Sequence, residues 1–155
     1  MKTGLKASSI TLALIGLAAL GVQPVLVSML IEVAHFSDSG AGYIASAEVF
    51  GIAATNAATT LAGHRWNWRK LCVAGLLLMI AGNLASIFSG ADAGSLMLSR
   101  FASGLGSGLL ISRGYAAAGL ARNPGRMFGY ILAVSTAQVA AASFLLPRWS
   151  ATGGV

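Results

Sequence analysis

The chain has 155 residues, of which 56% are hydrophobic and only 9% charged, and its mean hydropathy is +0.78. A soluble domain carries about 25% charged residues to cover a surface that faces water, so this composition excludes a water-soluble globular fold and favours a bilayer as solvent. The net charge is +6, but Lys and Arg lie in short clusters between apolar segments, which loop topology explains better than nucleic-acid binding. Cys72 is the one cysteine, so no disulfide can form within the chain.

Five apolar segments are long enough to cross a hydrocarbon core of about 30 Å, which takes about 20 helical residues. We expect membrane helices at about 9–34, 40–62, 71–89, 95–120 and 127–147, joined by short links. The sequence therefore predicts an all-α membrane protein: one transmembrane domain over residues 1–155, built as a polytopic bundle of about five helices. The lipid bilayer is its first expected partner.

The first segment has one alternative interpretation, a cleaved signal peptide, because Lys2 and Lys6 precede it. Its apolar stretch continues past Gln23 and Pro24 to Ile31, which is too long for such a peptide, and no clear cleavage site follows. We therefore interpret it as the first membrane helix.

The distribution of Lys and Arg predicts the orientation. The first and third links hold Asp38 and Asp92 and no basic residue. The N-terminal tail and the other two links are basic, with Lys2, Lys6, Arg65, Arg69, Lys70, Arg122 and Arg126. Because cytoplasmic loops carry the excess of Lys and Arg, we expect a multi-pass protein of the plasma (inner) membrane with its N-terminus in the cytoplasm.

Two charged residues lie within the predicted spans, Glu48 in the second and Arg100 in the fourth. A charge at the bilayer centre costs about 2.5–3.5 kcal/mol on insertion scales. At a rise of about 1.5 Å per residue, the two depths differ by about 4–5 Å, which two long side chains can bridge. The pair is either a proton- or substrate-responsive ion pair or a static one, or Arg100 snorkels outward and Glu48 faces water.

The fourth segment contains a glycine motif directly after its arginine. Residues 100–108 read RFASGLGSG, with the pattern R-x-x-x-G-x-G-x-G. This resembles the fourth-helix signature of the major facilitator superfamily, a membrane-embedded arginine followed by glycines. Gly104, Gly106 and Gly108 are then expected to allow close helix packing.

The link between the second and third segments resembles the cytoplasmic loop motif of the same family, G-x-L-a-D-R-x-G-R-[RK]. The resemblance makes His64, Arg65 and Arg69 the gating loop, with Arg65 and Arg69 in basic positions of the motif. Thr60, Asn67 and Trp68 depart from the family pattern. His64 stands in place of the acidic residue and cannot form the same charge pair with an opposing half.

The resemblance implies a fold of two six-helix halves with the substrate held between them near the midplane. It covers the first five of twelve helices, so a second half-transporter chain or a homo-oligomer is an implied partner. It also makes Gln23, Asn56 and Gln138 candidates to line the substrate cavity, and the alternative for each is a hydrogen bond between helices. Asn83 is assigned to packing because the third helix is peripheral in the family. Thr55 and Thr59 extend a polar stripe from Glu48 along the second helix.

The expected function is that of part of a secondary active transporter, a permease that moves a small solute by alternating access. Glu48 makes the proton the first candidate for the coupling ion. The alternative is a non-transporting five-helix protein, truncated or accessory, that assembles with another chain. We expect no enzyme and neither cofactor nor metal, because His35 and His64 lie near opposite faces and no acid accompanies a nucleophile.

Overall fold

The chain forms five helices in a computed structural model that describes the backbone of residues 3–62, 67–90 and 92–152, and the side chains of residues 10–62, 67–90 and 92–145. The helices are α1 (Thr3–Glu32), α2 (Asp38–Ala62), α3 (Trp68–Phe88), α4 (Ala93–Gly119) and α5 (Pro124–Thr152). No strand occurs in these described ranges, so the predicted all-α class is confirmed. The helices extend furthest beyond the expected membrane spans where α1 begins at Thr3 and α5 ends at Thr152, because apolar length marks a membrane span rather than a helix end.

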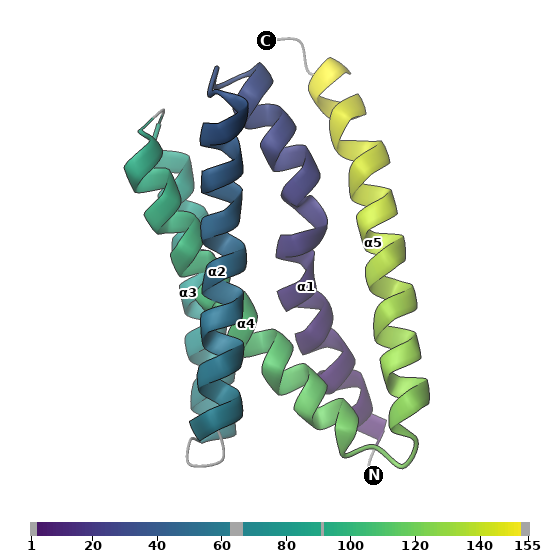
Figure 1. Ribbon diagram of the computed structural model, residues 1–155. Helices are drawn as coiled ribbons and strands as arrows, with labels where there is room; N and C mark the ends of the chain where they lie inside the picture. The colour runs from purple at the N-terminus through teal and green to yellow at the C-terminus, as the bar shows by residue number, and fades with distance from the viewer. Residues whose placement is uncertain (1–2, 63–66, 91, 153–155) are drawn as a thin grey trace.

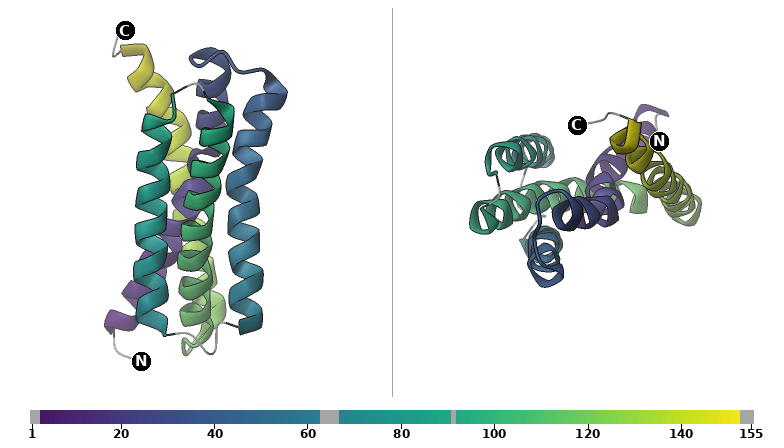
Figure 2. Two further views of the ribbon diagram at one scale, coloured as in Figure 1. Left: turned by 90° about the vertical axis from the view of Figure 1, so that its left-hand side faces the viewer. Right: turned by 90° about the horizontal axis from the view of Figure 1, so that it is seen from above.

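The helices lie side by side, and successive ones run in opposite directions (Figure 1). Helix α4 packs against α1, α2 and α3 and also touches α5, whereas α5 packs mainly against α1. Seen from above, α4 lies between α3 and the other helices (Figure 2). Helix α4 is therefore the centre of the fold, and most of the residues that it buries are small or polar.

Polar side chains cap the N-terminal ends of three helices, α3, α4 and α5. The side chain of Asn67 accepts hydrogen bonds from the backbone of Arg69 at 3.0 Å and of Lys70 at 3.3 Å, and that of Asp92 accepts one from the backbone of Ser95 at 2.8 Å. Asn123 does the same at the start of α5, accepting from Arg126 at 3.3 Å. Such caps satisfy backbone N–H groups that have no partner in the first turn of a helix. The hydrogen bonds from Ser95 also lower the pKa of Asp92.

Glycines set the close approach of α4 to its neighbours. A Cβ added at Gly104 would collide with the backbone oxygen of Glu48 in α2, and one at Gly108 would lie 2.8 Å from the backbone oxygen of Ile52. On another face of α4, a Cβ at Gly106 would lie 2.5 Å from the backbone oxygen of Gly75 in α3. Small residues thus bring backbones together where lipid provides no hydrophobic drive for association.

Three helices are long and apolar enough to cross a membrane: Ile10–Glu32, Trp68–Phe88 and Pro124–Leu145. Helices α2 and α4 have 25 and 27 residues but a less apolar composition, and neither qualifies by the same measure. The five predicted helices are therefore present, while hydropathy alone identifies three of them as candidate spans.

Large apolar side chains cover the outside of the bundle. Phe50 is 68% exposed, Leu98 70% and Phe88 84%. Soluble monomers rarely expose contiguous apolar surface on this scale, because it favours association. An apolar exterior around a polar interior is the arrangement expected of a protein whose solvent is lipid.

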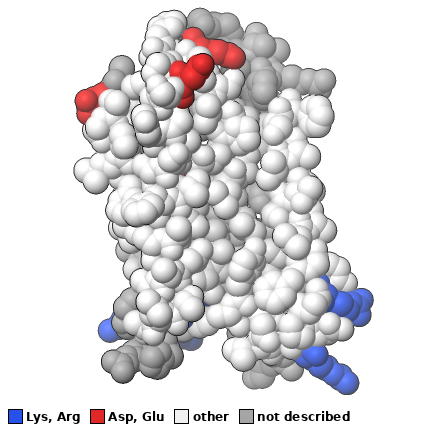
Figure 3. Space-filling view, in the orientation of Figure 1, with Lys and Arg blue, Asp and Glu red and all other residues white. Residues whose placement is uncertain are grey.

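Charge is separated between the two ends of the bundle. In the view drawn, Asp and Glu gather at the upper end and Lys and Arg at the lower end (Figure 3). Glu32 ends α1, Asp38 begins α2 and Asp92 directly precedes α4, whereas Arg122 lies in the link between α4 and α5 and Arg126 in the first turn of α5. The alternation of acidic and basic links along the sequence therefore gives the bundle one acidic end and one basic end.

Candidate functional site

A cluster of polar side chains, which we call the polar cluster, joins four helices of the bundle; Glu48, Arg100 and Ser103 are buried, and Asn83 at its edge is exposed. Helices α1 to α4 each contribute to it. Its members are Gln23, Glu48, Asn83, Ser86, Arg100 and Ser103. The glycine contacts between α4 and its neighbours explain the location, because backbones this close allow short polar side chains to reach the next helix.

Glu48 is the acidic member and is 1% exposed. Its Oε1 accepts a hydrogen bond from the hydroxyl of Ser103 at 3.1 Å. Its Oε2 accepts one from Nε2 of Gln23 at 3.1 Å and lies 3.7 Å from Nη1 of Arg100. Burying a carboxylate costs free energy unless the group is hydrogen-bonded and paired with a cation. The three neighbours from α1 and α4 supply these contacts and explain how Glu48 can be buried in α2.

Arg100 is the basic member and is 8% exposed. Its Nη2 donates to Oδ1 of Asn83 at 2.7 Å and to the hydroxyl of Ser86 at 2.9 Å. Its Nε donates to the same hydroxyl at 3.1 Å. The guanidinium is therefore held between α3, which supplies its hydrogen bonds, and α2, which supplies the opposite charge.

Asn83 was assigned to packing in the sequence analysis, and the structure gives it a larger role. Its Oδ1 accepts from Arg100, while its Nδ2 donates to the hydroxyl of Ser103 at 3.1 Å. Ser103 in turn donates to Glu48. A second route through hydrogen bonds thus joins the two charges, Arg100 to Asn83 to Ser103 to Glu48.

The ion pair itself is loose, since 3.7 Å between nitrogen and oxygen is longer than a charge-assisted hydrogen bond of about 2.7–2.9 Å. Chemically, Glu48 can take up a proton. Protonation would remove its attraction for Arg100 while leaving the hydrogen bonds of Arg100 to Asn83 and Ser86 in place. The arrangement can therefore change charge without losing every contact that holds the arginine.

Two cavities adjoin the polar cluster. One, of about 720 Å³, is lined by Asn83, Ser86 and Arg100 together with apolar residues that come mainly from α1. The other, of about 360 Å³, is lined by Gln23 and residues of α2. The polar cluster is therefore bordered by a hollow on two sides.

The three residues predicted to line one substrate cavity occupy different surroundings. Gln23 belongs to the polar cluster and also donates to the backbone oxygen of Ala45 at 3.2 Å. Asn56 and Gln138 are half-buried and line neither of these two cavities. Within the described residues, Oδ1 of Asn56 is buried without a hydrogen-bond partner.

The gating loop predicted at residues 63–70 is only partly described. His64 and Arg65 lie outside the described residues, and Arg69 is exposed in the first turn of α3. Arg113 of α4, which was not among the residues predicted from the sequence, is 7% exposed. Its guanidinium carbon lies 5.5 Å from the centre of the Trp68 ring, a cation–π distance.

No family model, no curated protein and no solved structure matches this chain.

Proposed function

We propose that the chain is part of a secondary active transporter of the major facilitator type that moves a small solute, with the proton as the coupling ion. The observation that carries the proposal is the Glu48–Arg100 pair, held inside the bundle by side chains from four helices. Ionisable residues at membrane depth are costly, and they mark ion or substrate pathways. The glycine motif that follows Arg100 packs α4 against α2 and α3, which fits its role in that family.

The proposal requires all five helices to cross the bilayer, including α2 and α4. Their lower hydropathy comes in part from residues that do not face lipid: Glu48, Thr55 and Thr59 of α2 are buried, as are Ser99, Ser103 and Ser107 of α4. A helix that turns such residues inward can present an apolar outside, as Phe50 and Leu98 do. These two spans can therefore be less apolar than the other three.

Coupling follows from the balance of charge in the polar cluster. While Glu48 is ionised, it attracts Arg100 and accepts hydrogen bonds from Gln23 and Ser103. Taking up a proton weakens the attraction between α2 and α4, so proton binding can bias how these helices pack. Alternating access also needs a second unit, supplied by further helices, a second half-transporter chain or a homo-oligomer.

The second candidate is an accessory membrane protein that assembles with another chain and moves no solute. The extended apolar exterior favours it, because such a surface can pack against other membrane helices as well as against lipid. In that case the Glu48–Arg100 pair has a structural role only.

The experiment that tests the proposal compares wild-type protein with the Glu48→Gln variant in membrane vesicles from the source cells. In each strain, the protein tested is the only copy of this chain that the cells produce. Across a panel of small solutes, we expect one whose gradient-driven accumulation is lost in Glu48→Gln while its exchange across the membrane survives. The reason is that exchange needs an intact site but no net proton movement, and Gln keeps the shape of the side chain.

Glu32→Gln is the matched control, because this exposed carboxylate ends α1 outside the polar cluster. It should leave both processes unchanged. If removal of the whole chain leaves uptake of every solute unchanged, the accessory role is favoured instead. Reconstituted alone, the 155-residue chain should show no saturable uptake; saturable flux would mean that a homo-oligomer supplies both halves.

A further inference from the structure

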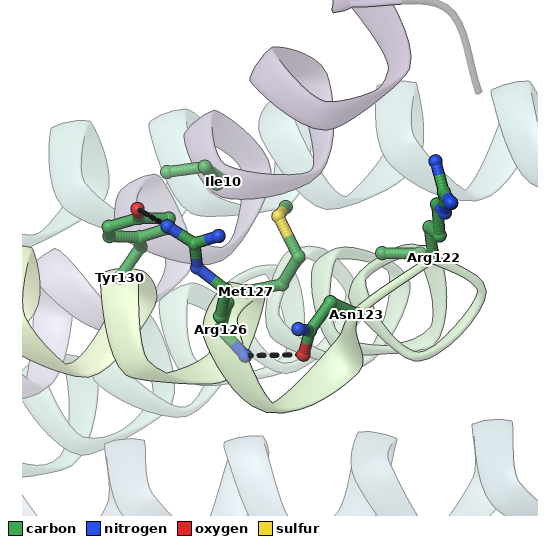
Figure 4. A pocket seen from close by; sticks show the side chains of 7 residues that line it. Ile10, Arg122, Asn123, Arg126, Met127 and Tyr130 are labelled. Carbon is green, nitrogen blue, oxygen red and sulfur yellow. Dashed lines mark hydrogen bonds between the residues drawn. The ribbon is translucent and has the colours of Figure 1, made fainter.

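A pocket lies at the basic end of the bundle, far from the polar cluster. Its volume is about 530 Å³, and its lining includes Ile10, Arg122, Asn123, Arg126, Met127 and Tyr130. The link between α4 and α5 and the first turns of α5 supply most of these residues, and α1 supplies Ile10. In Figure 4, Arg126 reaches toward Tyr130 on one side of Met127, and Arg122 lies on the other side.

Local contacts preorganise one side of this pocket. A nitrogen of the Arg126 guanidinium, Nη2, donates to the hydroxyl of Tyr130 at 3.4 Å. The backbone nitrogen of Arg126 donates to Oδ1 of Asn123 at 3.3 Å, which fixes the first turn of α5. The partial positive charge of this helix start adds to that of the two arginines.

The positive charge of this pocket has no counterpart within the chain. All four acidic residues lie elsewhere: Glu32, Asp38 and Asp92 at the opposite end, and Glu48 beside Arg100. Within the described residues, neither Arg122 nor Arg126 has an acid within 4 Å. An anion must therefore come from outside the chain if these guanidinium groups are to be neutralised.

The apolar part of the lining indicates the source of the anion. Ile10 and Met127 form a nonpolar wall beside the two arginines. Leu120 in the link after α4 and Leu132 in α5 are 76% and 60% exposed. A phospholipid combines a charged phosphate with acyl chains that remain in the apolar layer. Basic pockets between membrane helices on the cytoplasmic side suit such headgroups.

We propose that this pocket binds the phosphate group of an anionic phospholipid. Arg122 and Arg126 hold the phosphate oxygens from two sides, and the hydroxyl of Tyr130 supports Arg126. The acyl chains lie along the apolar wall of α1 and α5. This site requires that the chain is embedded in a bilayer, and it does not require transport.

The test is native mass spectrometry of the purified full chain in detergent micelles, titrated with phosphatidylglycerol or phosphatidylcholine. We expect one high-affinity phosphatidylglycerol per chain and no comparable site for phosphatidylcholine. The double variant Arg122→Gln/Arg126→Gln should raise the Kd for phosphatidylglycerol about thirtyfold, since two cations near the anionic headgroup are lost. The matched control, Arg69→Gln/Lys70→Gln, removes the same charge from exposed residues at the start of α3 and should leave the Kd unchanged.

Equal weakening in both double variants would overturn the proposal, because net charge alone would then explain binding. Displacement of the lipid by inorganic phosphate in large excess would also overturn it and identify soluble phosphate as the ligand. If the double glutamine variant does not fold, the double variant Arg122→Lys/Arg126→Lys takes its place in the titration. Lysine keeps the charge but lacks the planar fork of arginine, so weaker binding supports the site and unchanged binding contradicts it.

Discussion

Replacing either Glu48 or Arg100 alone should destabilise the folded chain by about 3–5 kcal/mol, and replacing both should cost much less than the sum. Both side chains are buried, and their charged atoms lie 3.7 Å apart. Glu48→Gln leaves a cation in the interior with no opposite charge, and Arg100→Met leaves a carboxylate with no cation. The double variant removes both charges together. The measurement is a double-mutant cycle on the melting temperature in detergent.

A second pair of changes serves as the control for this cycle. Glu32→Gln and Arg122→Met also remove one charge of each sign, but from exposed residues at opposite ends of the bundle. Their effects should be small and additive. Additive losses for Glu48→Gln and Arg100→Met as well would mean that the two charges act separately. In that case Asn83 and Ser86, rather than Glu48, would account for the position of Arg100.

Replacing Gly104 and Gly108 together with leucine should abolish the folded bundle in membranes or detergent. Each residue faces the backbone of α2, and even a single added carbon would collide with Glu48 or lie 2.8 Å from the backbone oxygen of Ile52. Overpacking typically costs about 1–3 kcal/mol, and more where backbone rather than a side chain must move. The separation of α2 from α4 would also break the contact of Glu48 with Ser103.

Gly42→Leu and Gly129→Leu provide the control, because nothing lies within 4 Å of a Cβ added at either position. Folded yield and melting temperature should change little in these variants. If the Gly104/Gly108 variant retains wild-type yield and melting temperature, the contact between α2 and α4 described here is not that of the folded protein.

The order of the helices and the separation of charge could be predicted from the sequence. A helix that crosses lipid needs a long apolar segment, and the links on the cytoplasmic side carry the excess of Lys and Arg. Helix ends could not be predicted, since caps such as Asn67 and Asp92 decide where a helix starts and leave no mark on hydropathy. The glycine motif could be recognised in the sequence as a site of close helix packing. Which neighbour each glycine faces required the structure, because the sequence does not fix how α4 is rotated about its axis.

The candidate site was predictable in its charges and not in its hydrogen bonds. Glu48 and Arg100 stand out because charge is rare within apolar segments and because their depths are similar. Asn83, Ser86 and Ser103 do not stand out, since small polar residues are common in membrane helices for packing alone. Arg113 could have been found by the criterion that identified Arg100, since it is a second charge within the same segment.

The central claim is that all five helices cross the membrane, which places Glu48 and Arg100 inside it. Single cysteines at Asp38, Asn67, Asp92 and Asn123 test each link in turn, in a background in which Cys72 is replaced by alanine. In intact cells, an impermeant thiol reagent should label the cysteines at residues 38 and 92, and label those at 67 and 123 only after permeabilisation. If only the three most apolar helices cross, residues 38 and 67 share one side and residues 92 and 123 the other. That second pattern would contradict the account, since α2 and α4 would then lie outside the hydrocarbon core.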